Sequence, residues 1–325
     1  MRFAMIGTGG IGGFYAAKLL AAGHDVTLVA RGEHLQVLQE QGLQVRHGEQ
    51  DYHFAQVDAC DAAAFFAERD SRQFDLIILA VKAQASETFA RELACWYAQC
   101  GVAVPVISFQ NGVDNEQRLA AHLGNDCVLG ALLIGVGAHI VGPGRIESTG
   151  PGRVVMGVWP NDRDTPSGSA ANLLPSLTTL FIEAGFPAEK TDDIRQELWR
   201  KLIINNGVNP LSALTGLDTR CLTTGEPFEP IALGLMQEVV AAARADGVEL
   251  GGEAAADMLH FMQTFDAIKT SMLVDKEKGR QLETDAISGA VLARAKTLGI
   301  DVPYTRCIHA LLTLEESRRH GVSGG

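Results

Sequence analysis

The chain has 325 residues, of which 46% are hydrophobic and 20% charged, a composition typical of a globular protein with room for two domains. Its formal net charge of −12 argues against a surface that binds nucleic acid or an anionic membrane. The six cysteines lack zinc-ligand spacing and no apolar stretch reaches about 18 residues, so we expect a cytoplasmic protein with neither a metal site nor a membrane segment.

The first half of the chain alternates short apolar runs with segments of helical spacing. The run FDLIILAV at 74–81 is typical of a strand that is buried on both faces of a parallel sheet. This alternation predicts a doubly wound α/β sheet of the Rossmann type, interrupted by an irregular segment between residues 41 and 74. The expected elements are strands at 3–6, 26–29, 74–81 and 102–109, and helices at 14–22, 35–41 and 86–95.

The character of the sequence changes twice further along. Between residues 128 and 158 frequent glycines separate short β-like runs, which predicts hairpins that extend the first domain. A polar loop at 161–169 precedes one more helix and strand. Beyond Asp193 the sequence is helical almost to its end, with long periodic segments at 231–245 and 279–298. We therefore predict a Rossmann domain at 1–192 and an all-α domain at 193–325.

A glycine-rich motif begins directly after the first predicted strand. Gly7-Thr8-Gly9-Gly10-Ile11-Gly12 fits G-x-G-x-x-G, a pattern that is weak alone but here follows a strand and opens a helix. Gly7 allows a tight turn, Gly9 lets the backbone approach a pyrophosphate, and Gly12 lets the helix pack close to the strand. The motif therefore predicts a dinucleotide site, and a glycine-rich turn without a ligand is the alternative.

The residues after the second strand bear on which nicotinamide cofactor fits. An NAD site usually has Asp or Glu there, which accepts hydrogen bonds from the ribose hydroxyls. This chain has Ala30 and then Arg31, whose guanidinium suits a 2′-phosphate that a carboxylate would repel. We therefore predict NADP(H), and the alternative is that Arg31 is a solvated residue at the strand end.

Three polar residues lie four apart in the segment ELWRKLIINNGVNP at 197–210. On a continuous helix, Lys201, Asn205 and Asn209 line one face among apolar neighbours. A lysine and two amides are costly to bury unless they find partners, and a substrate cleft provides them. Spacing alone equally allows a solvated helix face.

A second candidate group comprises Ser271 in TSMLVD and Glu283 in GRQLETDAISG. We expect Glu283 to lie within a helix that also bears Leu282, Ile287 and Val291. A carboxylate in such a place is more often solvated than functional, so the sequence leaves its role open.

Taken together, several motifs resemble the ketopantoate reductase (2-dehydropantoate 2-reductase) family. Their order and spacing span almost the whole chain, and the ELWRKL…N…NP element is the most specific of them. The motifs are GTGGIG at 7–12, LAVKA at 79–83, QNGVDN at 110–115, ELWRKLIINNGVNPL at 197–211 and SMLVD…ETD…G from residue 271.

The resemblance implies an NADPH-dependent oxidoreductase that converts 2-dehydropantoate to pantoate on the route to pantothenate and coenzyme A. It also implies that Lys201 is the catalytic lysine, followed by the amides of Asn205 and Asn209 in the substrate site. Glu283 would match the family's carboxylate that meets the substrate hydroxyl. Ser271 would match the serine that meets the substrate carboxylate.

On the cofactor side, the resemblance implies that Lys82 and Asn111 lie near the nicotinamide, with Asn111 also reaching the substrate. Arg31 would match the arginine that holds the 2′-phosphate. The apolar stretch ALLIGVGAHIVGPG at 131–144 departs from several family members, which carry hydroxyl groups there.

These residue types suit the chemistry. Hydride transfer to a 2-keto carbon leaves an alkoxide, whose charge Lys201 can stabilise and to which it can give a proton. Two alternatives stay open: an NADPH-dependent reductase of another branched 2-keto acid, and a non-catalytic NADP(H) sensor. The sequence leaves the oligomeric state open, a homodimer included.

Overall fold

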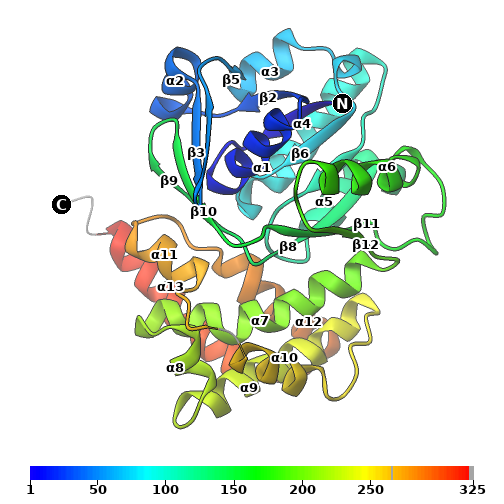
Figure 1. Cartoon of the computed structure of the whole chain (residues 1–325). Helices are drawn as coiled ribbons and strands as arrows, with labels where there is room; N and C mark the ends of the chain where they lie inside the picture. Colours follow the sequence, from blue (N-terminus) through cyan, green and yellow to red (C-terminus); the bar gives the residue numbers. More distant parts are fainter. Residues whose placement is uncertain (265, 322–325) are drawn as a thin grey trace. The chain divides into compact units, whose positions relative to one another are not determined.

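The computed structural model describes residues 1–264 and 266–321 and divides the chain into two compact units (Figure 1). Unit 1 comprises Met1–Gln110 and Asn115–Ile194, and unit 2 comprises Asn111–Asp114 and the chain from Arg195 onward. A parallel-sheet fold in the N-terminal part with a helical C-terminal part confirms the predicted fold class. Among the residues described, no helix is both long and apolar enough to cross a membrane.

The main sheet of unit 1 has the strand order β12-β11-β8-β7-β6-β1-β2-β5. Neighbouring strands from β5 to β8 are parallel, and β1 lies between β2 and β6, as in a Rossmann sheet. At the other edge β11 runs antiparallel to β8, so the sheet is mixed. The strands are β1 (Arg2–Ile6), β2 (Asp25–Val29), β5 (Asp58–Cys60), β6 (Leu76–Leu79), β7 (Val106–Ser108), β8 (Val128–Ile134), β11 (Arg153–Val158) and β12 (Ala188–Lys190).

The predicted helices of unit 1 are present with shifted ends. The first begins at Gly10 rather than residue 14, because the glycine motif itself supplies its first turn. A further helix follows the polar loop at 161–169, as predicted. The helices are α1 (Gly10–Ala21), α2 (Gly32–Gln41), α3 (Ala62–Glu68), α4 (Ser86–Cys100), α5 (Asn115–Leu123) and α6 (Ser169–Glu183).

The expectation of an irregular segment between residues 41 and 74 is wrong. That segment contains β5 and α3 together with two strands of a second sheet, whose order is β4-β3-β10-β9. The predicted hairpins at 128–158 are confirmed, and they serve both sheets: β8 and β11 pair in the main sheet, β9 and β10 in the second. The strands of the second sheet are β3 (Leu43–His47), β4 (Gln50–Phe54), β9 (Gly137–Gly142) and β10 (Arg145–Thr149).

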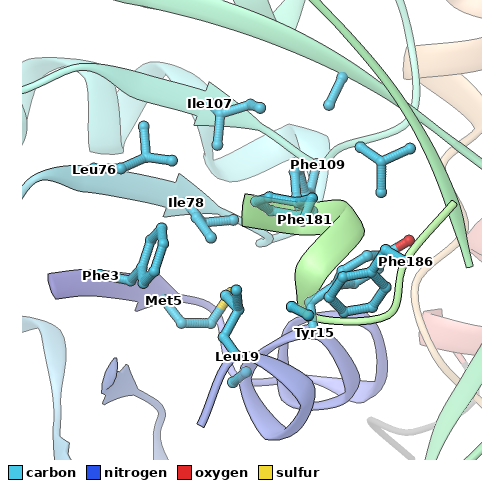
Figure 2. Close-up of a cluster of buried hydrophobic side chains, with 14 of the residues drawn as sticks. Phe3, Met5, Tyr15, Leu19, Leu76, Ile78, Ile107, Phe109, Phe181 and Phe186 are labelled. Carbon is cyan, nitrogen blue, oxygen red and sulfur yellow. The ribbon is translucent and has the colours of Figure 1, made fainter. Parts of the chain in front are cut away.

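The hydrophobic core of unit 1 packs α1 and α6 against one face of the main sheet (Figure 2). Successive strand residues point to opposite faces, so Phe3 and Met5 of β1 meet Tyr15 of α1 and Phe181 of α6. Burying each such side chain contributes about 1.5–3 kcal/mol. This packing fixes the position of α1, whose first turn holds the glycine motif.

The second sheet packs against α1 through β3, β9 and β10 (Figure 1). A Cβ atom built on Gly10 would lie 2.0 Å from the carbonyl oxygen of Ala138, and one on Gly13 would lie 2.1 Å from Cδ1 of Ile146. The approach at Gly10 is to backbone and requires glycine, whereas at Gly13 the end of the Ile146 side chain would have to shift. Two glycines that the sequence assigns to the motif or its helix therefore also hold the second sheet in place.

Unit 2 is helical, as predicted. Its helix α9 packs against α8, α10, α12 and α13. Asn206 of α7 donates hydrogen bonds to the carbonyl oxygen of Leu235 in α9 and to Oγ1 of Thr305 in α13, which joins α7 to this bundle. The helices are α7 (Ile194–Thr215), α8 (Thr219–Thr223), α9 (Phe228–Ala243), α10 (Ala254–Gln263), α11 (Ser271–Glu277), a π-helical turn (Asp285–Gly289), α12 (Ala290–Leu298) and α13 (Pro303–Gly321).

Candidate functional site

The glycine motif of unit 1 forms a tight turn that is tied to the end of β2. Gly7 has a φ of +99°, which favours glycine, and its N–H and that of Thr8 both donate to the carbonyl oxygen of Val29 at 3.0 Å. The buried Thr8 hydroxyl donates to the same oxygen at 3.2 Å. The loop between β1 and α1 is therefore held at a fixed place beside the carboxyl end of β2.

The remaining motif glycines differ in what surrounds them. A Cβ on Gly12 would lie 2.2 Å from the Gly7 carbonyl oxygen, whereas a Cβ on Gly9 would meet no atom within 4 Å. The N–H groups of Gly10, Ile11 and Gly12 belong to the first turn of α1, where an α-helix supplies no acceptor. Open backbone beside unpaired donors fits a pyrophosphate group, so these residues suit a dinucleotide.

The end of β2 carries a cation instead of a carboxylate. Ala30 follows the last strand residue, and the exposed Arg31 is the N-cap residue of α2. The only acidic residue in the first turn of α2 is Glu33, two residues beyond Arg31. Arg31 thus places a cation at the N-terminus of α2, beside the end of β2 to which the glycine motif is tied, with Glu33 two residues beyond it.

His34 is a residue of this region that sequence reasoning missed. Its Nδ1 accepts a hydrogen bond from the N–H of Gly144 at 3.0 Å, which links α2 to the turn between β9 and β10. Burial lowers the pKa of His34, an effect that the backbone of Thr8 partly opposes. The neutral ring therefore acts as a hydrogen-bond acceptor between Arg31 and the glycine motif. In the sequence, the only signal for this role is the position of His34 three residues after Arg31.

Lys82 lies three residues beyond the end of β6 and is exposed. The neighbouring residues Ala80 and Val81 contact Gly7, whose Cβ would lie 2.8 Å from both. Parallel strands end at one edge of a sheet, and the ligand of a Rossmann fold binds at that edge. Lys82 thus stands at the same edge as the glycine motif.

The polar stripe of unit 2 lies on an unbroken helix. Lys201, Asn205 and Asn209 all fall within α7, so they occupy one face four residues apart, as predicted. Lys201 and Asn205 are half-buried, and Asn209 is only 5% exposed. Within residues 1–264 and 266–321 neither amide forms a side-chain hydrogen bond, and the amide atoms of both are not fully enclosed, so they are available to a ligand.

Glu283 is buried at 7% exposure and accepts a hydrogen bond on Oε2 from Nδ2 of Asn111 at 3.0 Å. The expectation that Glu283 lies within a helix is wrong. It directly precedes the helical turn at Thr284, and its carbonyl oxygen accepts from the N–H of Ile287. A π-helical turn follows, a distortion that is frequent at functional sites.

Ser271 is the exposed first residue of α11, where Thr270 caps the helix by accepting from the N–H of Leu273 at 3.3 Å. Among the residues described, Ser271 has no hydrogen bond to another predicted site residue. The structure thus joins Asn111 to Glu283 in unit 2 and leaves Ser271 at a helix start of its own.

The glycine motif lies open at the carboxyl end of β1 in a Rossmann sheet, and the helical unit carries the lysine and two amides of α7. Together these features are those of a nucleotide-dependent oxidoreductase. Family models described as "Ketopantoate reductase PanE/ApbA" and "Ketopantoate reductase PanE/ApbA C terminal" match residues 3–161 and 193–316. The chain belongs to the ketopantoate reductase family, and the resemblance predicted from the sequence is confirmed.

Individual relatives agree with the family models. The 2-dehydropantoate 2-reductase of Mesorhizobium japonicum is 31% identical over 334 residues, covering 96% of this chain and 97% of its own. The crystal structure of a PanE/ApbA family ketopantoate reductase from Ralstonia eutropha is 32% identical, with a TM-score of 0.83 over 98% of this chain and 100% of its own. A D-mandelate dehydrogenase solved with NADH and anilino(oxo)acetate shares the fold, with a TM-score of 0.85 over 98% of this chain and 100% of its own, at 22% identity.

Proposed function

We propose that this protein reduces 2-dehydropantoate to pantoate with NADPH, a step toward pantothenate and coenzyme A. The observation that carries the proposal is the α7 face of Lys201, Asn205 and Asn209, a cation followed by two amides without side-chain hydrogen bonds among the residues described. The names of full-length relatives support the substrate. We place the reaction in the cytoplasm, where six free cysteines stay reduced.

The cofactor belongs to unit 1 in this proposal. The glycine motif, with unpaired N–H groups at the start of α1, receives the pyrophosphate, and Lys82 stands toward the nicotinamide end at the edge of the sheet. Arg31 pairs with the 2′-phosphate, which favours NADPH over NADH. When bound, NADPH supplies a hydride to the 2-keto carbon of the substrate.

The proton belongs to Lys201. As the keto carbon is reduced, negative charge develops on its oxygen, and the Lys201 ammonium stabilises that charge and then donates a proton to it. The resulting neutral amine regains a proton from water. Asn205 and Asn209 orient the substrate through hydrogen bonds without competing for this proton.

Three further side chains of unit 2 complete the assignment. Glu283 accepts a hydrogen bond from the substrate hydroxyl, and Asn111, already bonded to Glu283, donates to the substrate beside it. Ser271 binds the substrate carboxylate through its hydroxyl group. Each role is a hydrogen bond that a 2-hydroxy acid can form.

The neighbouring residue on α7 provides a matched control for the lysine. We expect Lys201→Ala to lower kcat roughly 10²- to 10⁴-fold, with the Kd for NADPH changed by less than about twofold. Arg200 is exposed and pairs with Glu197, so Arg200→Ala should leave both constants nearly unchanged. The measurements are steady-state oxidation of NADPH with ketopantoate and fluorescence titration of the cofactor. A Lys201→Ala enzyme of near-normal kcat would overturn the assignment.

Substrate choice requires a separate experiment. The family fold also occurs in a D-mandelate dehydrogenase, so another branched 2-keto acid is the second candidate substrate. We expect kcat/KM for ketopantoate to exceed that for pyruvate or 2-ketoisovalerate by at least about 100-fold. Equal values would favour the other reductase, and no turnover of any acid would favour a sensor.

A further inference from the structure

Four residues of the QNGVDN motif belong to unit 2 although both of their neighbours belong to unit 1. The neighbours share one anchor. Gln110 donates from Nε2 to Oγ of Ser86 at 2.8 Å, and this hydroxyl in turn donates to Oδ1 of Asn115 at 2.7 Å. A second bond from Gln110 to the carbonyl oxygen of Val81 holds the same end. Unit 1 therefore fixes where the segment Asn111–Asp114 leaves and returns.

Unit 2 holds the segment itself at its first and last residues. Asn111 donates to Glu283 at 3.0 Å, and Asp114 pairs through Oδ1 with Nη2 of Arg294 at 2.6 Å. Gly112 between them has a φ of +107°, a conformation that glycine adopts without the strain other residues would meet, so the segment turns sharply between its two held ends. The direction of the Asn111 amide thus depends on the anchor at Asp114.

Arg294 is itself a rigid anchor. Its side chain is 12% exposed, and its Nε and Nη2 atoms donate to both carboxylate oxygens of Asp246 at 3.0–3.2 Å. The guanidinium also lies 5.8 Å from the ring centroid of Trp199 in α7. A planar guanidinium held in this bidentate way presents the second N–H of Nη2 to Asp114 in a fixed direction, which a lysine could not do.

We propose that Arg294, acting through Asp114, is the positioning residue that sets Asn111 against Glu283. The inference rests on the proposed function, because Arg294 can affect turnover only if Asn111 contacts the substrate. Arg294 touches neither substrate nor cofactor in this scheme. It restricts a glycine-containing segment so that the Asn111 donor is in place before the keto acid binds.

The two carboxylates on Arg294 allow a matched comparison. Asp114 and Asp246 are similarly exposed, at 21% and 22%, and Asp114→Ala or Asp246→Ala removes one ion pair from the same guanidinium. Both variants should lower Tm by a few degrees, roughly as a lost partly buried pair does. We expect Asp114→Ala to lower kcat/KM for the keto acid by about tenfold, with the Kd for NADPH unchanged, and Asp246→Ala to cause a smaller loss, because Arg294 still pairs with Asp114 there but is held less rigidly. An unchanged kcat/KM in Asp114→Ala, or a loss in Asp246→Ala that exceeds the loss in Asp114→Ala, would overturn the proposal.

A double-mutant cycle with Asn111 tests the route of the effect. If Asp114 acts through Asn111, Asp114→Ala should cause little further loss in the Asn111→Ala background, whereas independent effects would multiply and refute the proposal. Arg294→Lys keeps the charge without the bidentate geometry, and we expect it to fold and to reproduce the kinetic loss of Asp114→Ala. If Asn111→Ala alone retains full turnover, the proposed role of Asn111 in substrate binding fails. This outcome differs from multiplying effects of the two substitutions, which would refute only the role of Arg294.

Discussion

Two glycines of the same motif should respond in opposite ways to one added methyl group. A Cβ on Gly9 meets no atom within 4 Å and its φ of −80° is ordinary for alanine, so Gly9→Ala should leave the free energy of unfolding unchanged or raise it by roughly 0.4–1 kcal/mol. A Cβ on Gly12 would lie 2.2 Å from the Gly7 carbonyl oxygen, which is backbone and cannot rotate away. Gly12→Ala should therefore lower the free energy of unfolding by about 1–3 kcal/mol.

For cofactor affinity, in contrast to stability, we expect Gly9→Ala to be the more damaging of the two substitutions. The methyl group of Gly9→Ala occupies the open space through which a pyrophosphate approaches the loop, so we expect the Kd for NADPH to rise at least about tenfold, or 1.4 kcal/mol. Urea unfolding and NADPH fluorescence titration measure the two effects on the same protein samples. Unchanged NADPH affinity in Gly9→Ala would refute a pyrophosphate at this glycine. Unchanged stability in Gly12→Ala would refute the steric reasoning.

The cofactor end and the histidine beside it supply two further tests. Arg31→Asp should raise the Kd for NADPH by more than about tenfold and that for NADH much less, and equal losses in a titration would remove Arg31 from the 2′-phosphate. Burial holds the pKa of His34 below its ordinary 6.5, so its contribution to stability is full above pH 6.5 and is lost as pH falls through the folded pKa. In His34→Asn the amide oxygen still accepts from Gly144 and does not titrate. Urea midpoints at pH 7.5 and 5.5 should therefore differ less than in the wild type, and an equal difference would contradict this role.

The inner strands β1, β6 and β8 of the main sheet were predictable because they are buried on both faces and are therefore largely apolar, whereas its short, partly exposed edge strand β5 was missed. The second sheet was not predictable in this way. β3 alternates buried Leu43 and Val45 with exposed Gln44 and Arg46, and it is five residues long. Its partner β4 follows directly after a turn at Gly48, but its other partner β10 lies about a hundred residues further along the chain, so no local pattern reveals that second pairing. For the same reason Gly13 has no visible function until Ile146 is seen against it.

The site residues divide in a similar way. The spacing of Lys201, Asn205 and Asn209 follows from helix geometry, so their common face was predictable once α7 was known to be continuous. The burial of Glu283 was not predictable, because it depends on a hydrogen bond from Asn111 across 172 positions of sequence. Sequence spacing predicts which residues share an element, and only the tertiary fold decides which polar groups find each other.

The assignment of the segment Asn111–Asp114 to unit 2 could not be predicted from the sequence. By position it follows β7 and precedes α5, both in unit 1, and every rule based on chain order assigns it there. Its side chains bond to unit 2 instead, because Asn111 donates a hydrogen bond to Glu283 and the Asp114 carboxylate pairs with the Arg294 guanidinium. A residue proposed to meet the substrate thus depends on the helical unit for its position, although the sheet unit supplies the chain on either side of it.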